Sequence, residues 1–590
     1  METETKNMEN KSVGENLWNL MSADEAEVSR IADGFGLPEY LSQIICNRKI
    51  RYDEVENFIN PKLRNLMPEP FILKDMEKAV NRVAEAIIKK QKIAIIGDYD
   101  VDGATSTSIL KRYFGALGVI PAVHIPSREE GYGPSDLAFA EFKKENAELV
   151  ITIDCGTTAF DVLNRASENG FDIIIIDHHE AENILPKVYA VVNPKRVDED
   201  NPYKYLEFMS AVGVGFMFLV ALNRKLRNSG IFANGGEPDL MQLLDLVALG
   251  TVCDVVPLLG LNRAYVKQGL KVMAQLNNVG LKNLMMISGV TSAPSSYHLG
   301  YVLGPRINAC GRVGNADLEN ILLCTESESE AKSLAEKFNA YNMERKDIED
   351  YVVLQAIEQL EKEPQEYPIA FVYGHDWHQG VIGIAAGKLR ERYNVPAFVM
   401  SVENDEVKGS ARSVDGIDLG ALIMSAKEQG LITGGGGHMM AAGFSLTEEQ
   451  IPEFKKFVGE YVTSKLGKEK ITPIINIDCA LNLSAVNTDL CKNLEILEPY
   501  GAGNPEPKIL IKNVILNYPQ IIGNGHVKCN VSSQRGGKIK AICFNCADNQ
   551  IGSAILNNKG EIFDIVGKIK SDNWMGRENV QIIIEDLMRK

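Results

Sequence analysis

The sequence predicts an α/β protein: a parallel-sheet domain, a second α/β domain joined to it by a long helix, and a small C-terminal β-barrel. Three observations lead to this prediction. Short apolar runs alternate with helical patterns over residues 76–320, a charged segment without Gly or Pro follows at 326–363, and strand-like runs dominate after residue 469. At about 150 residues per domain, a chain of 590 residues allows about three to five domains.

Residues 1–75 read as a small mixed segment, which we treat as an N-terminal extension. From residue 76 the pattern becomes regular. The helical spacing of EKAVNRVAEAIIKKQ precedes the buried-strand run KIAIIG, and the helical ATSTSILKRYFGALG is followed by the runs ELVITI, FDIIII and YAVVNP. Strands that alternate with helices at this spacing predict a doubly wound parallel sheet over 76–320.

The remaining elements follow in order. Residues 321–365 predict one or two long connecting helices, because the segment is charged and has no helix breaker. Residues 366–468 predict the second α/β domain, with IAFVYG and AFVMSV as strands and VIGIAAGKLRERYN as a helix. Residues 469–590 contain six short strand-like runs with turns between them, which is typical of an OB-type barrel.

Composition limits the class of protein further. Hydrophobic residues make up 45% and charged residues 24% of the chain, which excludes a largely disordered protein. No apolar run reaches the ~20 residues that span a bilayer, and the polar start lacks a signal-peptide core, so we expect a cytoplasmic protein without a membrane partner. Ten scattered cysteines fit reduced thiols. The net charge of −17 argues mildly against a bulk polyanion binder, because phosphate contacts usually accompany a basic excess.

Acidic residues follow the apolar runs of the first predicted domain. The candidates are Asp98, Asp100 and Asp102 after the first run, Asp154 after the second, Asp177, His178 and His179 after the third, and Asp254 in GTVCDVVPL. Because the carboxyl ends of parallel strands share one edge, where ligands bind, we expect these side chains to converge. A single aspartate more often caps a helix or a turn, but four acidic motifs in this register favour a functional site.

Crowded carboxylates repel one another unless cations neutralise them. Six aspartates supply a charge of −6, and two divalent ions would return +4. Oxygen and imidazole ligands together suit Mn²⁺, with Mg²⁺, Co²⁺ or Zn²⁺ as alternatives. Two such ions stabilise the attacking and the leaving oxygen in phosphoester cleavage. The pattern therefore predicts a two-metal phosphoester hydrolase.

The motifs GDYDVDG, IDCG, IDHHE and CDVVPL, in this order and at these separations, resemble those of the DHH phosphoesterases. GPRINACGR, GSARS, GGGGHMMAAG and LEPYGAGNPEPKI extend the resemblance from about residue 70 to the end, and make the chain similar to the single-stranded-DNA-specific exonucleases of that family. Residues 76–320 would then be the DHH domain, 366–468 the DHH-associated substrate-binding domain, and 469–590 the nucleic-acid-binding barrel.

The resemblance implies a role for each candidate. One metal ion would be bound by Asp98 and Asp100, the other by Asp102, His178 and Asp254, with Asp154 as the bridge between them. Asp177 and His179 would be ligands or would support the ligands, and His179 could instead contact the scissile phosphate. Catalytic roles would thus fall to Asp154, His178 and His179.

Arginines near glycines and small residues are candidates for phosphate contacts, because the guanidinium fork matches phosphate oxygens. Arg306 and Arg312 flank Asn308 in a segment without an acidic residue, although a lone arginine more often forms a surface ion pair. The resemblance assigns a pocket for the 5′ phosphate to Arg128, Arg306, Ser410 and Arg412. It also makes His438, after the glycine run 434–437, a contact to the phosphate or the terminal nucleotide.

Two other motifs are ambiguous. AVGVGF at 211–216 imitates a dinucleotide fingerprint but lacks the third glycine and a preceding strand, so helix packing is favoured. His526 and Cys529, with Cys543 and Cys546, have zinc-like spacing. The surrounding sequence alternates as strands do, which favours strands over a zinc site and leaves zinc as the alternative.

The expected function is that of a metal-dependent 5′→3′ exonuclease that hydrolyses single-stranded DNA to 5′-mononucleotides in DNA repair and recombination. By resemblance, a helicase and a single-stranded-DNA-binding protein are expected partners, and we expect a monomer. A DHH phosphodiesterase for short oligoribonucleotides or cyclic dinucleotides is the first alternative, and an inorganic pyrophosphatase is a weaker one. A non-catalytic single-strand-binding scaffold is the second alternative. The β-rich C-terminal part argues against the compact enzymes, and the intact acidic set argues against the scaffold.

Overall fold

The computed structural model describes residues 6–7, 11–128, 130–314, 317–362, 366–467, 472–534, 536–574 and 577–590. They form two compact units. The first unit comprises Met1–Gly14, Trp18–Asn339 and Asn476–Lys590, and the second comprises Glu15–Leu17 and Ala340–Ile475.

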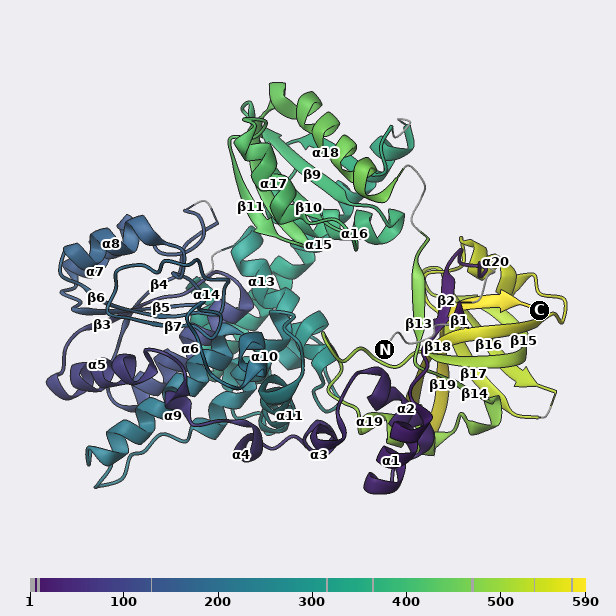
Figure 1. Ribbon diagram of the computed structural model, residues 1–590, viewed down its shortest axis with the longest axis horizontal. Coiled ribbons are helices and arrows are strands. Elements are labelled where there is room, and N and C mark those ends of the chain that lie inside the picture. The colour runs from purple at the N-terminus through teal and green to yellow at the C-terminus, as the bar shows by residue number, and fades with distance from the viewer. Residues whose placement is uncertain are drawn as a thin grey trace. The chain divides into compact units, whose positions relative to one another are not determined.

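The first unit contains the predicted parallel sheet (Figure 1). Its strands are β3 (Ile93–Ile96), β4 (Ala122–His124), β5 (Leu149–Ile153), β6 (Asp172–Ile176) and β7 (Ala190–Val192). They run in the order β4-β3-β5-β6-β7, and every pair is parallel. The four apolar runs are therefore strands, as predicted. Only the three-residue β4 gave no recognisable pattern, because each of its residues is partly exposed.

Helices cover both faces of this sheet, which is why the strands next to its centre are largely apolar. One face carries α5 (Met76–Lys89), α6 (Val101–Ala116) and α9 (Ala211–Asn228), and the other carries α7 (Asp136–Lys144) and α8 (Phe160–Glu168) (Figure 1). AVGVGF begins α9, so its glycines serve helix packing, as favoured. A Cβ on Gly215 would lie 2.9 Å from Cδ1 of Ile153 in β5.

A helical region follows the sheet. Its elements are η3 (Lys204–Phe208), η4 (Leu240–Leu243), α10 (Leu244–Cys253), α11 (Gly260–Met273), α12 (Val279–Ile287), the π-helix η5 (His298–Leu303), α13 (Gly304–Val313) and α14 (Asp317–Cys324). The predicted connection is one helix, α15 (Glu328–Lys362), of 35 residues.

The C-terminal part of the first unit is a closed β-barrel, as predicted. Its strands are β14 (Cys479–Leu481), β15 (Ile509–Ile522), β16 (His526–Ser533), β17 (Lys538–Cys543), β18 (Ile562–Trp574) and β19 (Arg577–Arg589). The order is β14-β15-β16-β17-β19-β18, and β15 also pairs with β18, which closes the barrel. Two helices accompany it, α19 (Thr488–Glu495) and α20 (Gln550–Leu556).

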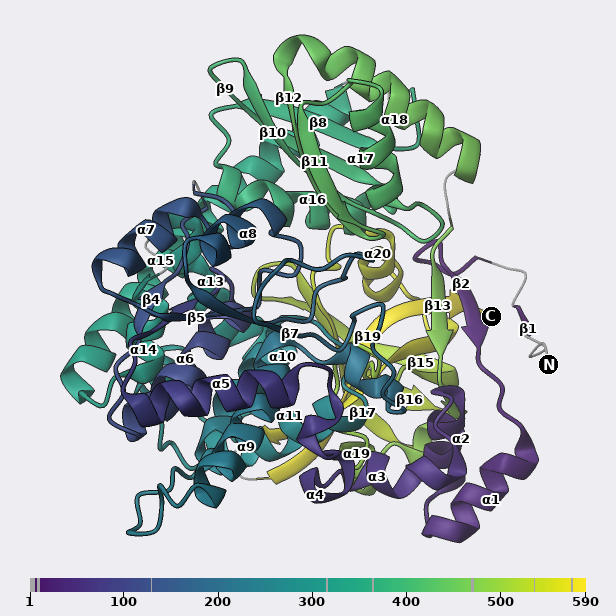
Figure 2. The same ribbon diagram turned by 60° about the vertical axis from the view of Figure 1, so that its left-hand side comes forward.

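The N-terminal extension packs against the barrel. It contains β1 (Lys6–Asn7), β2 (Leu17–Leu20), α1 (Glu25–Phe35), α2 (Glu39–Asn47), η1 (Tyr52–Glu54), α3 (Val55–Ile59), α4 (Leu63–Leu66) and η2 (Pro70–Ile72). Buried side chains of α1, α2 and α3 share one apolar core with the barrel strands, and α1 and α2 lie beside the barrel in Figures 1 and 2. Asp586 of β19 accepts hydrogen bonds from Ser12 Oγ and from Trp18 Nε1 (2.9 Å). No pattern in residues 1–75 predicts this packing.

The second unit is the predicted second α/β domain. Its strands are β8 (Ala370–His375), β9 (Ala397–Glu403), β10 (Glu406–Arg412), β11 (Gly434–His438) and β12 (Ala441–Thr447), in the order β11-β12-β10-β9-β8. α17 (Leu419–Glu428) and α18 (Ile451–Leu466) pack on one apolar core, and α16 (Gln379–Tyr393) packs on another. The glycine run 434–437 forms the edge strand β11 and not a loop. A short η6 (Glu448–Gln450) precedes α18, and β13 (Ile474–Ile477) joins β1 and β2 in a small separate sheet.

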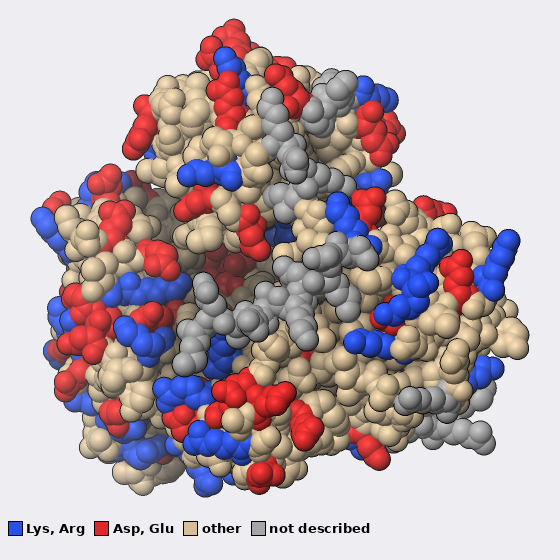
Figure 3. Space-filling view, turned by 45° about the vertical axis from the view of Figure 1, so that its right-hand side comes forward, with Lys and Arg blue, Asp and Glu red and all other residues tan. Residues whose placement is uncertain are grey.

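Surface and composition agree with an ordinary folded protein. All ten cysteines are free thiols. Among the described residues, no helix combines the length and the apolar content needed to cross a membrane. On the face seen in Figure 3, basic and acidic side chains are interspersed and form no broad basic surface. Contacts to a polyanion would therefore have to be local on that face.

Candidate metal centre

The predicted acidic residues lie at the carboxyl edge of the parallel sheet. Asp98 comes two residues after β3, and Asp154 and Asp177 directly follow β5 and β6. Asp154 has a left-handed backbone (φ 62°), and its N–H donates to the Ile176 carbonyl (3.0 Å), which fixes it against the neighbouring strand. The topology thus gathers residues that are far apart in the sequence.

The loop after β3 turns at once into α6. Asp100 caps this helix by accepting a hydrogen bond from the Gly103 N–H (3.0 Å), and Asp102 lies buried in the first turn. A Cβ on Gly103 would lie 2.4 Å from the Asp98 carbonyl oxygen, so glycine permits this close approach. The two carboxylate oxygens of Asp102 accept from the N–H groups of Ala211 (2.6 Å) and Val212 (3.0 Å) at the start of α9.

His178 is oriented by the backbone. Its Nδ1 lies 3.1 Å from the Met209 carbonyl oxygen, which accepts the Nδ1 proton and leaves the Nε2 lone pair available for a metal ion. Nε2 is 3.3 Å from Asp154 Oδ1 and 3.9 Å from Asp102 Oδ2. Asp254, which caps the C-terminal end of α10, has its Oδ2 3.6 Å from His178 Nδ1.

Three overlapping sets of side chains have ligand atoms close enough to hold a metal ion. They are Asp98, Asp100 and Asp154; Asp102, His178 and Asp254; and Asp154, His178 and His179. Three of their buried oxygens, Asp98 Oδ1, Asp154 Oδ1 and Asp254 Oδ2, accept no hydrogen bond from the described residues. Buried acceptors without donors, in a set of carboxylates and imidazoles that contains no thiolate, fit Mn²⁺ or Mg²⁺.

The pKa values of the buried aspartates also indicate a site for divalent ions. Burial, followed by the charge of Asp100, raises the pKa of Asp98 to about 8 and that of Asp102 to about 7. Burial and the neighbouring aspartates also raise the pKa of Asp154 and of Asp254 well above the usual range. Without cations these carboxyls would hold protons at neutral pH, and divalent ions would replace those protons.

Asp177 is held by hydrogen bonds from the backbone and from His179. Its Oδ1 accepts from the backbone N–H of His178 (2.7 Å) and from His179 Nδ1 (2.7 Å), and its Oδ2 accepts from the Thr157 N–H (3.0 Å). It belongs to none of the three sets. Burial favours its neutral form, but the hydrogen bond from His179, the charges of both histidines and the hydrogen bond from Thr157 together outweigh burial and lower the pKa of Asp177. Of the two roles left open, the geometry favours support of His179.

His179 stands at the edge of the centre. Burial opposes its charged form, but the hydrogen bond to Asp177 and the charges of the nearby aspartates together outweigh burial and raise the pKa of His179. Tyr132, which sequence reasoning missed, has its hydroxyl 3.1 Å from His179 Nδ1 and donates to the Asp154 carbonyl oxygen (3.0 Å). No motif marks Tyr132, since it lies in the loop before α7.

Glu319 of α14 is a second residue that sequence reasoning missed. Burial raises its pKa well above the usual range, and the charges of Asp100 and Asp98 add to this effect. It is therefore a further carboxyl beside the acidic loop. The surrounding sequence, NADLEN, is typical of a helix start and gives no signal that Glu319 is near the site.

Of the predicted phosphate contacts in the first unit, Arg128 lies beside this acidic loop. Arg128 stacks on the Tyr99 ring (4.2 Å to the centroid), and its Nε donates to the Gly311 carbonyl oxygen (2.9 Å). Arg306, Asn308 and Arg312 all lie on α13. Arg306 donates to Asn339 Oδ1 (3.1 Å) and to the Val302 carbonyl oxygen (2.7 Å), which holds its guanidinium near the preceding helical turn.

The predicted contacts of the second unit share one end of its sheet. Ser410 and Arg412 lie on β10, and Arg412 Nη1 donates to Ser410 Oγ (3.1 Å). Arg412 and His438 are both in register with Ala441 of the intervening strand β12, so their backbones are about 10 Å apart. Burial, followed by the charge of Arg390, lowers the pKa of Arg412.

The zinc-like motif forms strands instead. His526 and Cys529 lie on β16 and Cys543 ends β17, as the alternation favoured. His526 Nδ1 accepts from the Asn545 N–H (3.0 Å), and burial raises the pKa of the Cys529 thiol to about 12. Among the described residues these side chains do not join any set that could hold a metal ion.

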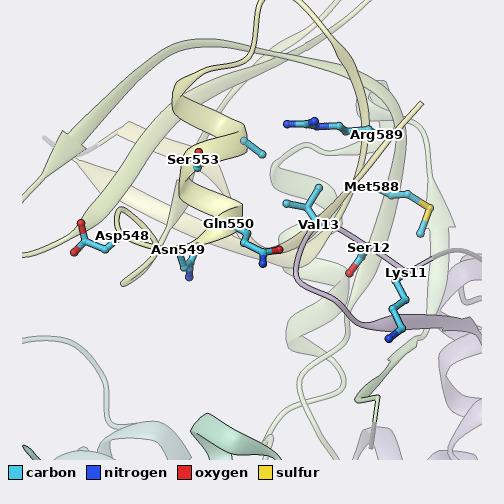
Figure 4. A pocket seen from close by; sticks show the side chains of 10 residues that line it. Lys11, Ser12, Val13, Asp548, Asn549, Gln550, Ser553, Met588 and Arg589 are labelled. Carbon is cyan, nitrogen blue, oxygen red and sulfur yellow. The ribbon is translucent and has the colours of Figure 1, made fainter. Parts of the chain in front are cut away.

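A hollow of about 730 Å³ in the first unit lies apart from these residues (Figure 4). It is lined by Lys11, Ser12, Val13, Asp548, Asn549, Gln550, Ser553, Ala554, Met588 and Arg589. None of the predicted site residues borders it, and its mixed lining carries no arrangement suited to catalysis.

Comparison with known proteins agrees with this geometry. The model of the DHH family, N-terminal domain, matches residues 92–251, that of the DHHA1 domain matches 366–464, and that of the RecJ OB domain matches 477–586. With the acidic sheet edge, these matches define a DHH phosphoesterase that carries an OB domain.

Individual relatives show which family of DHH phosphoesterases the chain resembles. The single-stranded-DNA-specific exonuclease RecJ of Bacillus subtilis is 32% identical over 578 residues, which cover 96% of this chain and 70% of the relative. RecJ of Thermus thermophilus in complex with Mn²⁺ has a TM-score of 0.81 and 28% identity, covering 97% of this chain and 79% of the other. Its complex with Mg²⁺ has a TM-score of 0.75, 26% identity and coverages of 97% and 78%. The chain belongs to the RecJ family.

Proposed function

We propose that this chain is an exonuclease specific for single-stranded DNA, that it degrades its substrate from the 5′ end to 5′-mononucleotides, and that it requires two divalent ions, with Mn²⁺ favoured and Mg²⁺ possible. The observation that carries the proposal is the convergence of five aspartates and two histidines at one sheet edge, in sets that share Asp154 and His178. The DNA-directed activity rests on the RecJ relatives, whose name states it.

Two of the proposed ligands, Asp102 and His178, are oriented by backbone groups. Asp98 and Asp100 would hold one ion, Asp102, His178 and Asp254 the other, and Asp154 would contact both. The α9 N–H groups fix Asp102, and the Met209 carbonyl fixes His178. When bound, two divalent ions stabilise the attacking and the leaving oxygen of a phosphodiester.

His179 would contact the scissile phosphate. Asp177 orients its ring and helps to raise its pKa, which favours the protonated form that a phosphate oxygen would bind. A charged imidazole placed by a carboxylate donates a strong hydrogen bond to a phosphate oxygen. Tyr132 would contact the same ring nitrogen as Asp177, Nδ1, from which its hydroxyl is 3.1 Å away.

The 5′ phosphate would be bound by Arg128, Arg306, Ser410 and Arg412, with His438 beside the terminal nucleotide. Support comes from the chemistry of the residues: arginine forks match phosphate oxygens. A pocket for the 5′ phosphate would explain a 5′ starting point, because it would recognise that end of the strand.

An end-label assay tests the proposal. Single-stranded and blunt duplex DNA, labelled at either end, are incubated with the protein and Mn²⁺. We expect the 5′ label of the single strand to be released first, as mononucleotide, and removal of the 5′ phosphate to raise KM. Degradation of blunt duplex, or earlier loss of the 3′ label, would contradict the proposal. Competition by short RNA or cyclic dinucleotides at lower concentration than DNA would favour the phosphodiesterase alternative.

We further propose a cytoplasmic role in DNA repair and recombination, as a monomer that works with a helicase and a single-stranded-DNA-binding protein. Family membership supports this proposal, since the substrate must first be exposed as a single strand. Light scattering of the protein with and without DNA tests the monomer, and pull-down with the purified partners tests the contacts.

A further inference from the structure

Two exposed tyrosines stack on each other at the π-helical turn η5. The ring centroids of Tyr297 and Tyr301 are 5.3 Å apart with an interplanar angle of 27°, and the two residues are 62% and 75% exposed. The motif-based prediction assigned them no role. Paired aromatic rings left in water lose the free energy that burial would give them, so such a patch often has a binding function.

The turn that carries them is structurally unusual. Residues 298–303 form a π-helix, a rare conformation that occurs preferentially at functional sites. It is anchored by Ser296, whose Oγ donates to the Tyr500 carbonyl oxygen (2.6 Å), and by His298, whose Nδ1 accepts from the Ser295 N–H (3.1 Å). The tyrosines are therefore displayed from a fixed backbone, which lowers the entropy cost of stacking a ligand on them.

The turn adjoins the metal centre. Cys253 Sγ donates to the Leu299 carbonyl oxygen (3.5 Å), and Cys253 directly precedes Asp254. A Cβ on Gly304 would lie 2.5 Å from Cys253 Sγ, so η5 and the end of α10 are in close contact. In the other direction η5 continues into α13, and Arg306 of that helix donates to the Val302 carbonyl oxygen within the turn.

The turn also reaches the barrel within the same unit. Tyr500 belongs to the segment that leads into β15. Lys568 on β18 forms an ion pair with Glu585 (2.9 Å), and it lies within electrostatic reach of Tyr301. A strand that runs from the metal centre toward the barrel would therefore pass the tyrosine pair, with the cationic Arg306 at the same turn.

We propose that Tyr297 and Tyr301 form a platform on which a base of the single-stranded DNA substrate stacks, between the metal centre and the barrel. The inference rests on the proposed function and adds a binding site to it. Aromatic rings bind single strands by stacking on any base, while nearby cations hold the phosphates. The platform would accept every base and exclude a duplex end, in which no base is free to unstack onto it.

Binding without turnover tests the platform. The full chain is titrated, in EDTA, with a 5′-phosphorylated oligothymidine of about 20 nucleotides and with oligonucleotides carrying one 2-aminopurine at successive positions. We expect the double variant Tyr297→Leu/Tyr301→Leu to bind about tenfold more weakly, which corresponds to loss of one stacked base. The double variant to Phe keeps both rings and should bind as the wild type does. We also expect 2-aminopurine fluorescence to be quenched at one position by the wild type and by the Phe variant but not by the Leu variant.

The outcomes separate this inference from the proposed function. If the wild type binds the oligonucleotide and the Leu variant, with an unchanged melting temperature, binds it equally well, the platform is refuted and the proposed function stands. If Tyr518→Leu, which removes the exposed barrel tyrosine beside Lys538, abolishes the quenching instead, stacking takes place on the barrel and the platform is again refuted. If the wild type does not bind single-stranded DNA, the proposed function fails and the platform with it.

Discussion

At the scale of single residues, the centre is defined by carboxyls that the fold forces together. Asp98, Asp102, Asp154 and Asp254 each have a raised pKa, with burial as the largest cause. Such an arrangement costs stability unless cations are present, which is typical of functional sites. The protonation of these residues should therefore be linked to metal binding.

The pH dependence of metal binding follows from these pKa values. Between about pH 4 and pH 8 the folded metal-free protein keeps protons that the unfolded chain releases, so the stability contributed by Asp98 and Asp102 is lost as pH rises. Mn²⁺ binds the deprotonated form, so its affinity should rise from pH 6 to pH 8, about tenfold per pH unit for each proton displaced. Calorimetric titration in buffers of different ionisation enthalpy measures both the affinity and the proton release. An affinity that does not change with pH would contradict the crowded-carboxylate account.

Substitution of Asp177 tests whether this residue binds a metal ion or orients His179. Asp177→Asn should lower turnover about 10- to 100-fold, because it weakens the hydrogen bond that orients His179, while the number of bound Mn²⁺ ions stays the same. Metal content measured after gel filtration in Mn²⁺, together with turnover, gives both values. Loss of a bound ion would show that Asp177 is a ligand after all.

At the scale of elements, helix α9 takes part in the centre by its first N–H groups. Ala211 is the first residue of that helix, where proline is well tolerated, and Ser210 before it is extended (ψ 165°), as a residue before proline must be. Ala211→Pro should therefore remove one donor to Asp102 while leaving the helix intact.

The expected result of Ala211→Pro is a loss of about tenfold in Mn²⁺ affinity, since a hydrogen bond to a charged group contributes roughly 1.5–3 kcal/mol. Ala211→Ser keeps the N–H and is the matched control. Mn²⁺ titration of both variants, with circular dichroism as a check on the helix, measures the effect. Equal affinities in the proline and serine variants would mean that the α9 N–H groups do not support Asp102.

The sequence predicted the buried strands of the site, but it did not predict the contacts between distant segments. The strands before Asp98, Asp154 and Asp177 were predictable because buried parallel strands are apolar throughout, and their ends then fixed the site. The contact between Asp102 and α9 was not predictable, since backbone N–H groups have no side-chain signature. The strand β11 was equally hidden, because a glycine run looks like a flexible turn until it is paired with β12.

At the scale of the whole first unit, Arg263 joins three distant segments. This buried guanidinium donates to the carbonyl oxygens of Phe58 (2.6 Å), Leu497 (2.9 Å), Glu498 (2.8 Å) and Pro499 (3.2 Å). It also lies over the Phe58 ring at 4.1 Å. One side chain of α11 thereby connects the N-terminal extension to the segment that leads into the barrel, which a linear reading of domains could not reveal.

Arg263→Met should destabilise the protein by roughly 3 kcal/mol, because it leaves several buried carbonyl groups without a donor. Arg263→Lys should recover only part of this, since an ammonium lacks the fork that reaches several carbonyl oxygens. Urea unfolding at constant pH measures both free energies. Wild-type stability of the methionine variant would refute the connecting role.

The central claim is that the acidic sheet edge binds metal ions that are needed to cleave single-stranded DNA. Titrating the metal-free protein with Mn²⁺ while 5′-mononucleotide release is recorded tests it most directly. The matched variant is Asp154→Asn, because asparagine tolerates the left-handed backbone at this position. We predict that wild-type activity saturates at two ions per chain, and that Asp154→Asn binds fewer ions and loses at least about 100-fold in turnover. Mononucleotide release without a divalent ion, or at the wild-type rate by Asp154→Asn, would contradict the account.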